Sequence, residues 1–385
     1  MNHFIANNQV SLLCNGYDYF PALIAAIQNA RHEIYLQTYI YTLDRTGENV
    51  GEALQQAARR GVSVYLLLDG FGSRALPKTY VTALKSSGIE VLFFRPKISP
   101  WTLKRSRLRR LHSKVAVIDG MTAFVGGINI IDDYNTPSHI PPRIDYAVKI
   151  EGALLKKIHA NAKHIWRSVC LRQGHITQQN TAKINSFRKT DNGMRAAFLV
   201  RDNLKHRRDI ENAYLSTIKL AKSEIIIANA YFLPGLRFRH ALRDAVVRGV
   251  TVKLILQQRT EYFFLDFATR ALYTALLSQG IHIYEYHKSH MHSKVAIIDQ
   301  HFSIVGSSNI DPFSLFLSLE ANVVIDSKVF SEQLKQHLLN TIETGSVEMT
   351  KDQWQRGYYL KRTMSWMVYS LVKLMLAVIG YPENI

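Results

Sequence analysis

Short apolar runs rich in branched side chains alternate along the chain with segments that are apolar on one side only. In the first quarter of the sequence, apolar runs predict buried strands over 33–41 and 62–69. Amphipathic segments predict helices over 21–30 and 50–60, with Pro21 in the first turn of its helix. Strands separated by helices of this length pair in parallel, so the pattern predicts an α/β fold with helices on the faces of a sheet.

The same order of elements occurs twice. The pattern AxxEIxL begins at Ala30 and again at Ala221, and GVxVxLxL follows it in both places. The segment HSKVAVIDGMTAFVGGINI, from His112, returns as HSKVAIIDQHFSIVGSSNI, from His292. Several matches in one order indicate that an α/β domain has been duplicated. The earlier matches are 188 to 192 residues apart and the last is 180 apart, which places extra residues before His112. They belong to a stretch at 96–110 with six Lys or Arg, predicted to be a basic loop beside the motif.

Composition divides the chain into four parts. The predicted first half covers 1–172 and the second covers 195–345. Between them, 173–194 is rich in Gln, Asn, Thr and Lys and is predicted to be a linker. The last part, 346–385, is an apolar tail.

The charge is strongly positive, with 48 Lys and Arg against 30 Asp and Glu and a net charge of +18. Such an excess favours a polyanionic partner, and nucleic acid and anionic lipid satisfy it equally well. A generally basic surface with no such partner is the alternative. The two cysteines, Cys14 and Cys170, indicate no disulfide framework and a reducing environment. We expect neither a secretory signal at the N-terminus nor a membrane span of about 20 apolar residues.

The repeated segment carries the candidate chemistry. Each copy has His, Lys, Asp, Gly and Asn at positions 1, 3, 8, 15 and 18, namely His112, Lys114, Asp119, Gly126 and Asn129, and His292, Lys294, Asp299, Gly306 and Asn309. Residues 1 and 3 of a strand point to the same face, so His and Lys emerge together. Two copies would put two imidazoles on one phosphate, one to attack and one to protonate the leaving oxygen. The lysines and asparagines would bind the nonbridging oxygens, with no need of a metal or another cofactor.

Each motif residue has a plainer alternative. A histidine on an apolar strand is often part of the core. The motif aspartate is followed by Gly120 in the first copy, between apolar runs, and this pair predicts a two-residue hairpin turn. We group Asp119 and Asp299 with the catalytic residues, with a structural role at the turn as the alternative. His282, His287 and His290 near His292 lack zinc-like partners, so no metal is expected.

The motif HxKxxxxD, followed by GG or GS and then Asn, resembles the signature of the phospholipase D superfamily. The resemblance implies two mixed sheets flanked by helices, related by a pseudo-twofold axis, with one shared active site. It implies a covalent phosphohistidine, with His112 as nucleophile and His292 as acid. It also implies a carboxylate about thirty residues after each motif histidine that orients the ring. Asp145 lies 33 residues after His112 and Glu320 lies 28 after His292; an ordinary charge at a strand edge is the alternative for both.

Segments outside the motif narrow the resemblance. RDNLKHRRDIENAYLSTIKLAKSEIIIANAYFLPG, from Arg201, and GSSNIDPFSLFLSLEANVVI, from Gly306, resemble bacterial cardiolipin synthases of the B type over roughly residues 10–345. This implies a phosphatidyltransferase that joins two phospholipids, two phosphatidylglycerols above all, into cardiolipin and glycerol. It also implies peripheral binding to the cytoplasmic face of the bacterial inner membrane. Lipid hydrolysis and a phospholipase D-type nuclease remain alternatives, and protein partners stay open.

The tail bears on the choice between lipid and nucleic acid. Residues 364–380 are apolar and aromatic, as is the cluster at 262–265, and both favour a lipid interface over nucleic acid. The seventeen residues from Met364 are short for a span and include Lys373. We predict shallow insertion into an anionic leaflet, with packing on the protein's own core as the alternative.

Overall fold

The computed structural model describes residues 4–96, 109–137, 139–174, 193–258, 263–357 and 359–378. Most of the predicted linker (173–194), most of the basic stretch (96–110) and part of the 262–265 cluster lie outside these ranges. The first half contains, in order, β1 (Ile5–Cys14), α1 (Asn15–Gln28), β2 (Glu33–Thr38), α2 (Arg45–Arg59), β3 (Ser63–Asp69), α3 (Lys78–Ser86), β4 (Glu90–Phe94), β5 (Lys114–Ile118), β6 (Thr122–Gly126), β7 (Arg143–Ile144), β8 (Tyr146–Gly152) and α5 (Leu155–Gln173).

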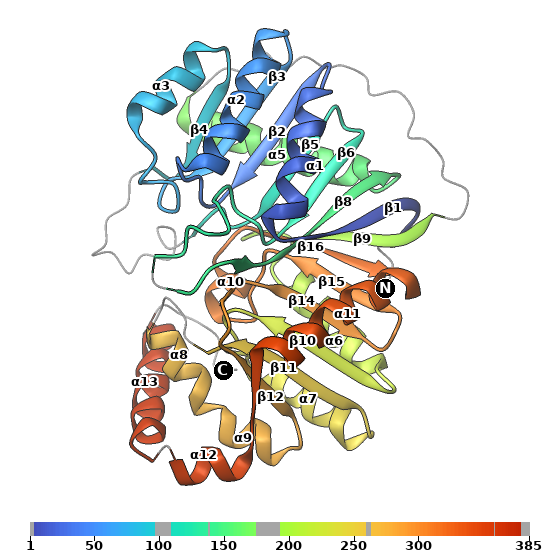
Figure 1. The fold of residues 1–385 in the computed structure, drawn as a ribbon, viewed down its shortest axis with the longest axis vertical. Helices are drawn as coiled ribbons and strands as arrows, with labels where there is room; N and C mark the ends of the chain where they lie inside the picture. Colours follow the sequence, from blue (N-terminus) through green and yellow to red (C-terminus); the bar gives the residue numbers. More distant parts are fainter. Residues whose placement is uncertain are drawn as a thin grey trace.

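The second half largely repeats this order and continues into the tail (Figure 1). It differs in having two helices in the place of α3, a short strand before the motif hairpin and not after it, and one added short helix. Its elements are β9 (Met194–Arg201), α6 (Asp209–Leu220), β10 (Glu224–Asn229), α7 (Leu236–Val247), β11 (Thr251–Gln257), α8 (Phe263–Ala271), α9 (Tyr273–Ser278), β12 (His282–Tyr286), β13 (His290–Met291), β14 (Lys294–Ile298), β15 (Phe302–Gly306), α10 (Pro312–Phe316), β16 (Glu320–Asp326), α11 (Lys328–Gly345), β17 (Ser346–Met349), α12 (Lys351–Gly357) and α13 (Tyr359–Val378).

Fifteen strands form one continuous mixed sheet, in the order β17-β12-β11-β10-β14-β15-β16-β9-β1-β8-β6-β5-β2-β3-β4. Without β17, the order reads the same from either end once each strand is replaced by its counterpart in the other half. The predicted mixed α/β fold with internal repetition is therefore confirmed. The structure differs from the prediction of two sheets in one respect: β1 and β9 pair antiparallel and join the two sheets into one. Each half begins with this strand, so the pseudo-twofold relation places the two equivalent strands side by side at the junction.

The local elements follow the predicted ones with shifted ends. Helix α2 begins at Arg45, five residues earlier than predicted, because the Asp44 side chain caps it by accepting from the Gly47 backbone N–H at 3.0 Å. Helix α1 begins at Asn15, so Pro21 lies inside the helix and not in its first turn as predicted. Asp119 and Gly120 have φ values of 52° and 60°, as a two-residue hairpin turn between β5 and β6 requires.

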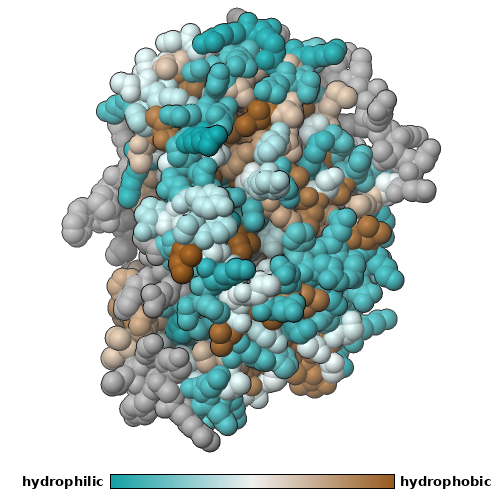
Figure 2. Space-filling model, viewed as in Figure 1, coloured by the Kyte–Doolittle hydropathy of each residue, from teal (hydrophilic) through white to brown (hydrophobic). Residues whose placement is uncertain are grey.

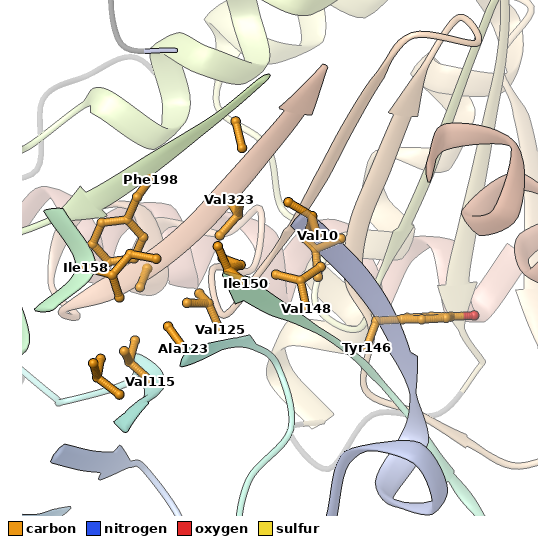
Figure 3. Packing of buried hydrophobic residues seen from close by; sticks show 14 of the residues in the cluster. Val10, Val115, Ala123, Val125, Tyr146, Val148, Ile150, Ile158, Phe198 and Val323 are labelled. Carbon is orange, nitrogen blue, oxygen red and sulfur yellow. The ribbon is translucent and has the colours of Figure 1, made fainter. Parts of the chain in front are cut away.

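The core consists of three clusters of buried apolar side chains. One is shared between the halves: it combines Val148 and Ile150 of β8 with Phe198 of β9 and Val323 of β16 (Figure 3). Helices α5 and α11 cover this shared core. The other two clusters each belong to one half, under α1 and α2 in the first and under α6 and α7 in the second. The two halves are therefore held together by both a sheet and a core.

The tail folds onto the second half. Strand β17 pairs antiparallel with β12 at the sheet edge, and Trp354 of α12 donates from Nε1 to Thr274 Oγ1 at 3.0 Å. Helix α13 lies along α8 (Figure 1), and its Tyr369 and Val372 join the core of that half. In the part of the chain that is described, no helix is long and apolar enough to cross a membrane.

Candidate active site

Both copies of the motif lie at the same edge of the sheet. Strand β5 starts at Lys114 and runs antiparallel to β2, so His112 lies beyond the carboxyl end of β2. Strand β14 starts at Lys294, opposite Asn229 at the end of β10, and His292 is placed in the same way. The carboxyl edge of parallel strands is where α/β proteins usually bind ligands.

Two short contacts between the halves close the site. In the first, β7 pairs in parallel with β13, and His292 N–H donates to the Ile144 carbonyl at 2.8 Å. In the second, an isolated bridge joins Leu111 to Leu319, and His112 N–H donates to the Leu319 carbonyl at 2.9 Å. The first contact places His292 beside Asp145, the residue after Ile144, and the second places His112 beside Glu320, the residue after Leu319.

The orienting carboxylates therefore cross between the halves. His112 Nδ1 lies 2.9 Å and 3.1 Å from the two Glu320 oxygens. His292 Nδ1 lies 2.6 Å from Asp145 Oδ2. Both predicted carboxylates are at the histidines, but the expectation that each serves the motif about thirty residues before it is wrong. Each half is incomplete without the other.

The carboxylates determine which ring nitrogen is available. A carboxylate only accepts, so Nδ1 of His112 carries the proton and donates it to Glu320. At His292 Nδ1 lies 2.8 Å from Lys294 Nζ and 2.6 Å from Asp145 Oδ2, and we assign the proton to Nδ1 because the carboxylate is the nearer partner. The Nε2 atom of each neutral ring then holds the lone pair. The side chains of His112 and His292 are 14% and 12% exposed, which leaves a ring edge accessible in an otherwise buried site.

The motif lysines are buried next to the histidines. Lys114 Nζ donates to the His112 carbonyl at 2.7 Å. Lys294 Nζ donates to the His292 carbonyl and lies 3.6 Å from Asp145 Oδ2. Both lysines are at most 2% exposed. Each half thus brings one cation to the histidines, as predicted.

The motif asparagines are also buried, but they are held differently. Asn129 Oδ1 accepts from the Ile40 N–H at 3.1 Å, and its Nδ2 has no hydrogen-bond partner among the described residues. At Asn309 the atom without a hydrogen-bond partner within the described ranges is Oδ1. In the second half Asn229 is hydrogen-bonded in the way that Asn129 is in the first. Its Oδ1 accepts from the Ile310 N–H at 3.2 Å, and its Nδ2 has no partner among the described residues. A buried amide N–H₂ without a partner is a donor available to a phosphate oxygen.

Burial favours the neutral form of both histidines in the ligand-free site. It lowers the pKa of His112 below its usual range, and the Glu320 carboxylate only partly opposes this effect. Burial also lowers the pKa of His292, and the positive charge of Lys294 adds to it. Lys294 further lowers the pKa of His112, and Lys114 that of His292, so the two halves form one electrostatic site. Burial lowers the pKa of Lys114 to about 7 and that of Lys294 to about 8; an anionic ligand would favour their charged forms.

The two motif aspartates make backbone contacts at the hairpin turn, which favours the structural alternative over a catalytic role. Asp119 accepts from the backbone N–H groups of Arg31, His32 and Glu33 at 2.8–2.9 Å. Asp299 accepts from Lys222, Ser223 and Glu224 in the same way. Both lie at the far end of their strands from the motif histidine. They fasten the hairpin to the start of the neighbouring antiparallel strand, β2 in the first half and β10 in the second.

Several residues that shape the site were not predicted. Asp69 Oδ2 accepts from the Leu111 N–H at 2.8 Å, and Gln257 Oε1 accepts from the Met291 N–H at 2.7 Å. The two residues end the repeated runs VYLLLD and VKLILQ, so alignment of the halves could have singled them out. Ser307 donates to Glu320, whereas its counterpart Gly127 leaves room for Asp145, whose oxygen would lie 2.3 Å from an added Cβ.

Known proteins resemble this chain over nearly its whole length. The family model for the "Cardiolipin synthase, PLD-like domain" matches residues 23–166 and 214–342. Cardiolipin synthase B of Salmonella typhi is 35% identical over 384 residues, which cover 97% of this chain and 90% of that protein. The Escherichia coli K12 protein of the same name is 35% identical over 385 residues, with the same coverage.

Solved structures share the fold. Phosphatidylserine synthase of Haemophilus influenzae superposes with a TM-score of 0.69 at 13% identity, covering 100% of this chain and 97% of its own. Polyphosphate kinase of Porphyromonas gingivalis superposes with a TM-score of 0.58 at 13% identity, covering 89% of this chain and 49% of its own. Identities this low support the fold alone. The family model in both halves and the similarity in sequence show that the chain belongs to the cardiolipin synthase family of phospholipase D-type phosphatidyltransferases.

Proposed function

We infer that the protein joins two phosphatidylglycerol molecules into cardiolipin and glycerol through a phosphatidyl group carried on His112. The observation that carries this inference is the pair of motif histidines, each bound through Nδ1 to a carboxylate of the other half. This arrangement directs two Nε2 atoms to one site, as transfer in two displacements requires.

In the first displacement His112 Nε2 attacks the phosphorus of one phosphatidylglycerol and forms a P–N bond. The P–O bond to the headgroup glycerol breaks, and the leaving oxygen takes a proton from His292, whose protonated form is favoured by the negative charge of the bound phosphodiester. In the second, a hydroxyl of the second phosphatidylglycerol gives its proton to His292 and attacks the same phosphorus. The P–N bond breaks, and His112 returns to its starting state. Water in place of that hydroxyl would give phosphatidate, which is the competing hydrolysis.

The positive groups stabilise the charge that the phosphoryl oxygens gain. Lys114 and Lys294 each lie beside a motif histidine and are buried where water does not screen them. Asn129 offers an amide donor. This supports phosphate binding by Lys114, Lys294 and Asn129, and we assign Asn309 to the same role from its place in the motif, with no metal or other cofactor needed.

The proposed reaction is tested by incubating the purified protein with phosphatidylglycerol vesicles and identifying the products. We expect cardiolipin and glycerol in equal amounts, formed equally well with EDTA present. Phosphatidate as the main product would identify a hydrolase. Cleavage of nucleic acid without any lipid product would identify a nuclease. A strict need for a divalent ion would contradict the role given to the lysines.

The rate should depend on pH with both an acidic and a basic limb. The nucleophilic ring must be neutral, and its pKa lies below the usual value, so kcat/KM should rise with pH and level off below pH 6.5. His292 must be protonated as the acid and the lysines must stay charged, so kcat/KM should fall as pH rises, and no later than about pH 7 to 8, where the lysines lose their protons. Lys294→Arg, which stays charged, should weaken the basic limb if it folds. A flat profile from pH 6 to 9 would contradict the role of the lysines.

Helix α13 is the segment that we assign to membrane binding. Ser365, Tyr369 and Val372 face the protein. The opposite side exposes six large apolar residues, Met364, Trp366, Met367, Leu371, Leu374 and Met375. Apolar side chains also appear at the edge of the molecule where Figure 1 places α8 and α13 (Figure 2). The helix thus packs on the core with one side, as the alternative expectation had it, and keeps an apolar side for shallow insertion. We place it on the anionic cytoplasmic leaflet of the bacterial inner membrane.

Substitutions on the exposed side of α13 should weaken membrane binding and spare the fold. Deleting the helix is a poor test, because Tyr369 and Val372 belong to the core. We expect Trp366→Ser, Met367→Ser and Leu371→Ser together to reduce binding to phosphatidylglycerol vesicles at least about tenfold in sedimentation, since each buried apolar side chain contributes about 1–3 kcal/mol. Thermal unfolding should change little.

A matched control places the same change elsewhere. Leu171→Ser and Val247→Ser also remove exposed apolar side chains, 80% and 81% exposed, but away from α13. They should leave vesicle binding unchanged. Equal loss of binding in both sets, or normal binding in the α13 variant, would contradict the assignment.

A further inference from the structure

A basic pocket adjoins the active site. It encloses about 500 Å³, and five of its lining residues are cationic, Arg109, Arg201, Lys205, Arg207 and Arg208, against the single acidic residue Asp209. None of these six residues belongs to the repeated motif. The charges and the size of the pocket suit an anionic group of lipid-headgroup size.

Two adjacent chain segments connect this pocket to the catalytic centre. Arg109 is three residues before His112, while Phe316 and Leu317 of the pocket wall lead to Glu320. The segments run side by side, because the Leu319 N–H donates to the Arg110 carbonyl at 2.8 Å. Arg201 of β9 lies directly opposite Glu320 of β16 in the antiparallel register of the two strands. The pocket therefore adjoins the catalytic pair His112–Glu320.

Three of the positive charges in this pocket, those of Lys205, Arg207 and Arg208, are available for a ligand. Arg201 helps to form the wall, since its guanidinium donates to the carbonyls of Phe316 and Ser318. Asp209 is engaged by His206 Nδ1 at 2.7 Å. Lys205, Arg207 and Arg208 form no ion pair with any carboxylate in the described ranges. Arg207 donates from Nε to the Asn203 carbonyl at 3.1 Å, and its remaining guanidinium N–H groups, together with those of Arg208, are well suited to a phosphate ester.

The proposed reaction requires a second anion site. The lysines of the motif bind the phosphodiester under attack, but the acceptor phosphatidylglycerol carries its own phosphodiester, one glycerol away from the attacked phosphorus. Two such anions in one site repel each other unless the second one meets separate cations. Resting on the proposed function, we propose that the basic pocket binds the phosphate ester of the acceptor phospholipid and so favours cardiolipin over products of neutral acceptors.

The test compares an acceptor that carries a phosphate with one that does not. The full-length protein is given phosphatidylglycerol in detergent micelles with a fixed amount of ethanol, and the ratio of cardiolipin to phosphatidylethanol is measured. In Arg207→Gln/Arg208→Gln we expect this ratio to fall roughly 10- to 100-fold, the size expected for charge-assisted hydrogen bonds. Arg207→Lys/Arg208→Lys should recover much of it. The control Lys219→Gln/Arg243→Gln, which removes two exposed charges outside the pocket, should keep the wild-type ratio.

The outcomes separate this proposal from the proposed function. If the wild-type protein makes phosphatidylethanol but no cardiolipin, the proposed function fails. If it makes both and the ratio is unchanged in Arg207→Gln/Arg208→Gln, the assignment of the pocket fails. Glycerol 3-phosphate distinguishes free phosphate from lipid: should it bind the wild-type protein and not this variant while the ratio stays constant, the pocket binds a soluble phosphate ester and the acceptor assignment is overturned.

Discussion

Replacing either motif histidine by alanine should reduce phosphatidyl transfer by at least about 10³-fold. His112→Ala removes the proposed nucleophile, and His292→Ala removes the acid and base; general acid–base catalysis alone is worth roughly 10²–10⁴-fold. Because the two rings act on one phosphorus, the double variant should be little worse than either single variant. Turnover is measured as cardiolipin formed from phosphatidylglycerol.

Variants elsewhere separate chemistry from folding in this experiment. His301→Ala removes a histidine whose side chain is 67% exposed, and it should keep wild-type turnover. Circular dichroism and thermal unfolding of both motif variants should resemble those of the control. If one motif histidine could be replaced with more than about a tenth of the activity retained, the halves would not share one active site.

The amino-acid sequence singles out the residues that we propose to be catalytic, but it does not predict how they are arranged. The second copy of a motif reveals which residues are kept together, so His112, His292 and the two lysines can be recognised from the repeat alone. Local elements are also predictable: the apolar run that forms β3 and the turn at Asp119 follow from hydrophobic pattern and turn chemistry.

Contacts between the halves could not be predicted from sequence spacing. The crossing of Asp145 and Glu320 depends on where β7 and the segment at Leu319 meet the other half, over separations of 147 and 208 residues. The joining of β1 to β9 depends on the same docking. Asp119 and Asp299 show the limit of arguing from repetition, because duplication preserves the bonds that hold a hairpin in place as well as it preserves catalytic groups.

The crossed carboxylates lead to the second large effect. Glu320→Gln should impair His112, and Asp145→Asn should impair His292, each by roughly 10²–10⁴-fold in transfer from phosphatidylglycerol. An amide can donate to Nδ1, which shifts the proton to Nε2 and removes the lone pair that attacks or accepts. Sequence spacing gives the reverse grouping, with Asp145 serving His112 and Glu320 serving His292.

A substrate with a good leaving group separates these two groupings. Phosphatidyl p-nitrophenol releases a phenolate that needs no proton, so the first displacement depends on the nucleophile and little on the acid. We expect His292→Ala and Asp145→Asn to release nitrophenol and to accumulate an acid-labile, base-stable phosphoryl group on His112. His112→Ala and Glu320→Gln should do neither. If Asp145→Asn behaved like His112→Ala while Glu320→Gln still released nitrophenol, the crossed pairing would not govern catalysis. If the label appeared on His292 in the His112→Ala variant, the two histidines would exchange roles, and Glu320→Gln would then be the variant that releases nitrophenol and traps the adduct.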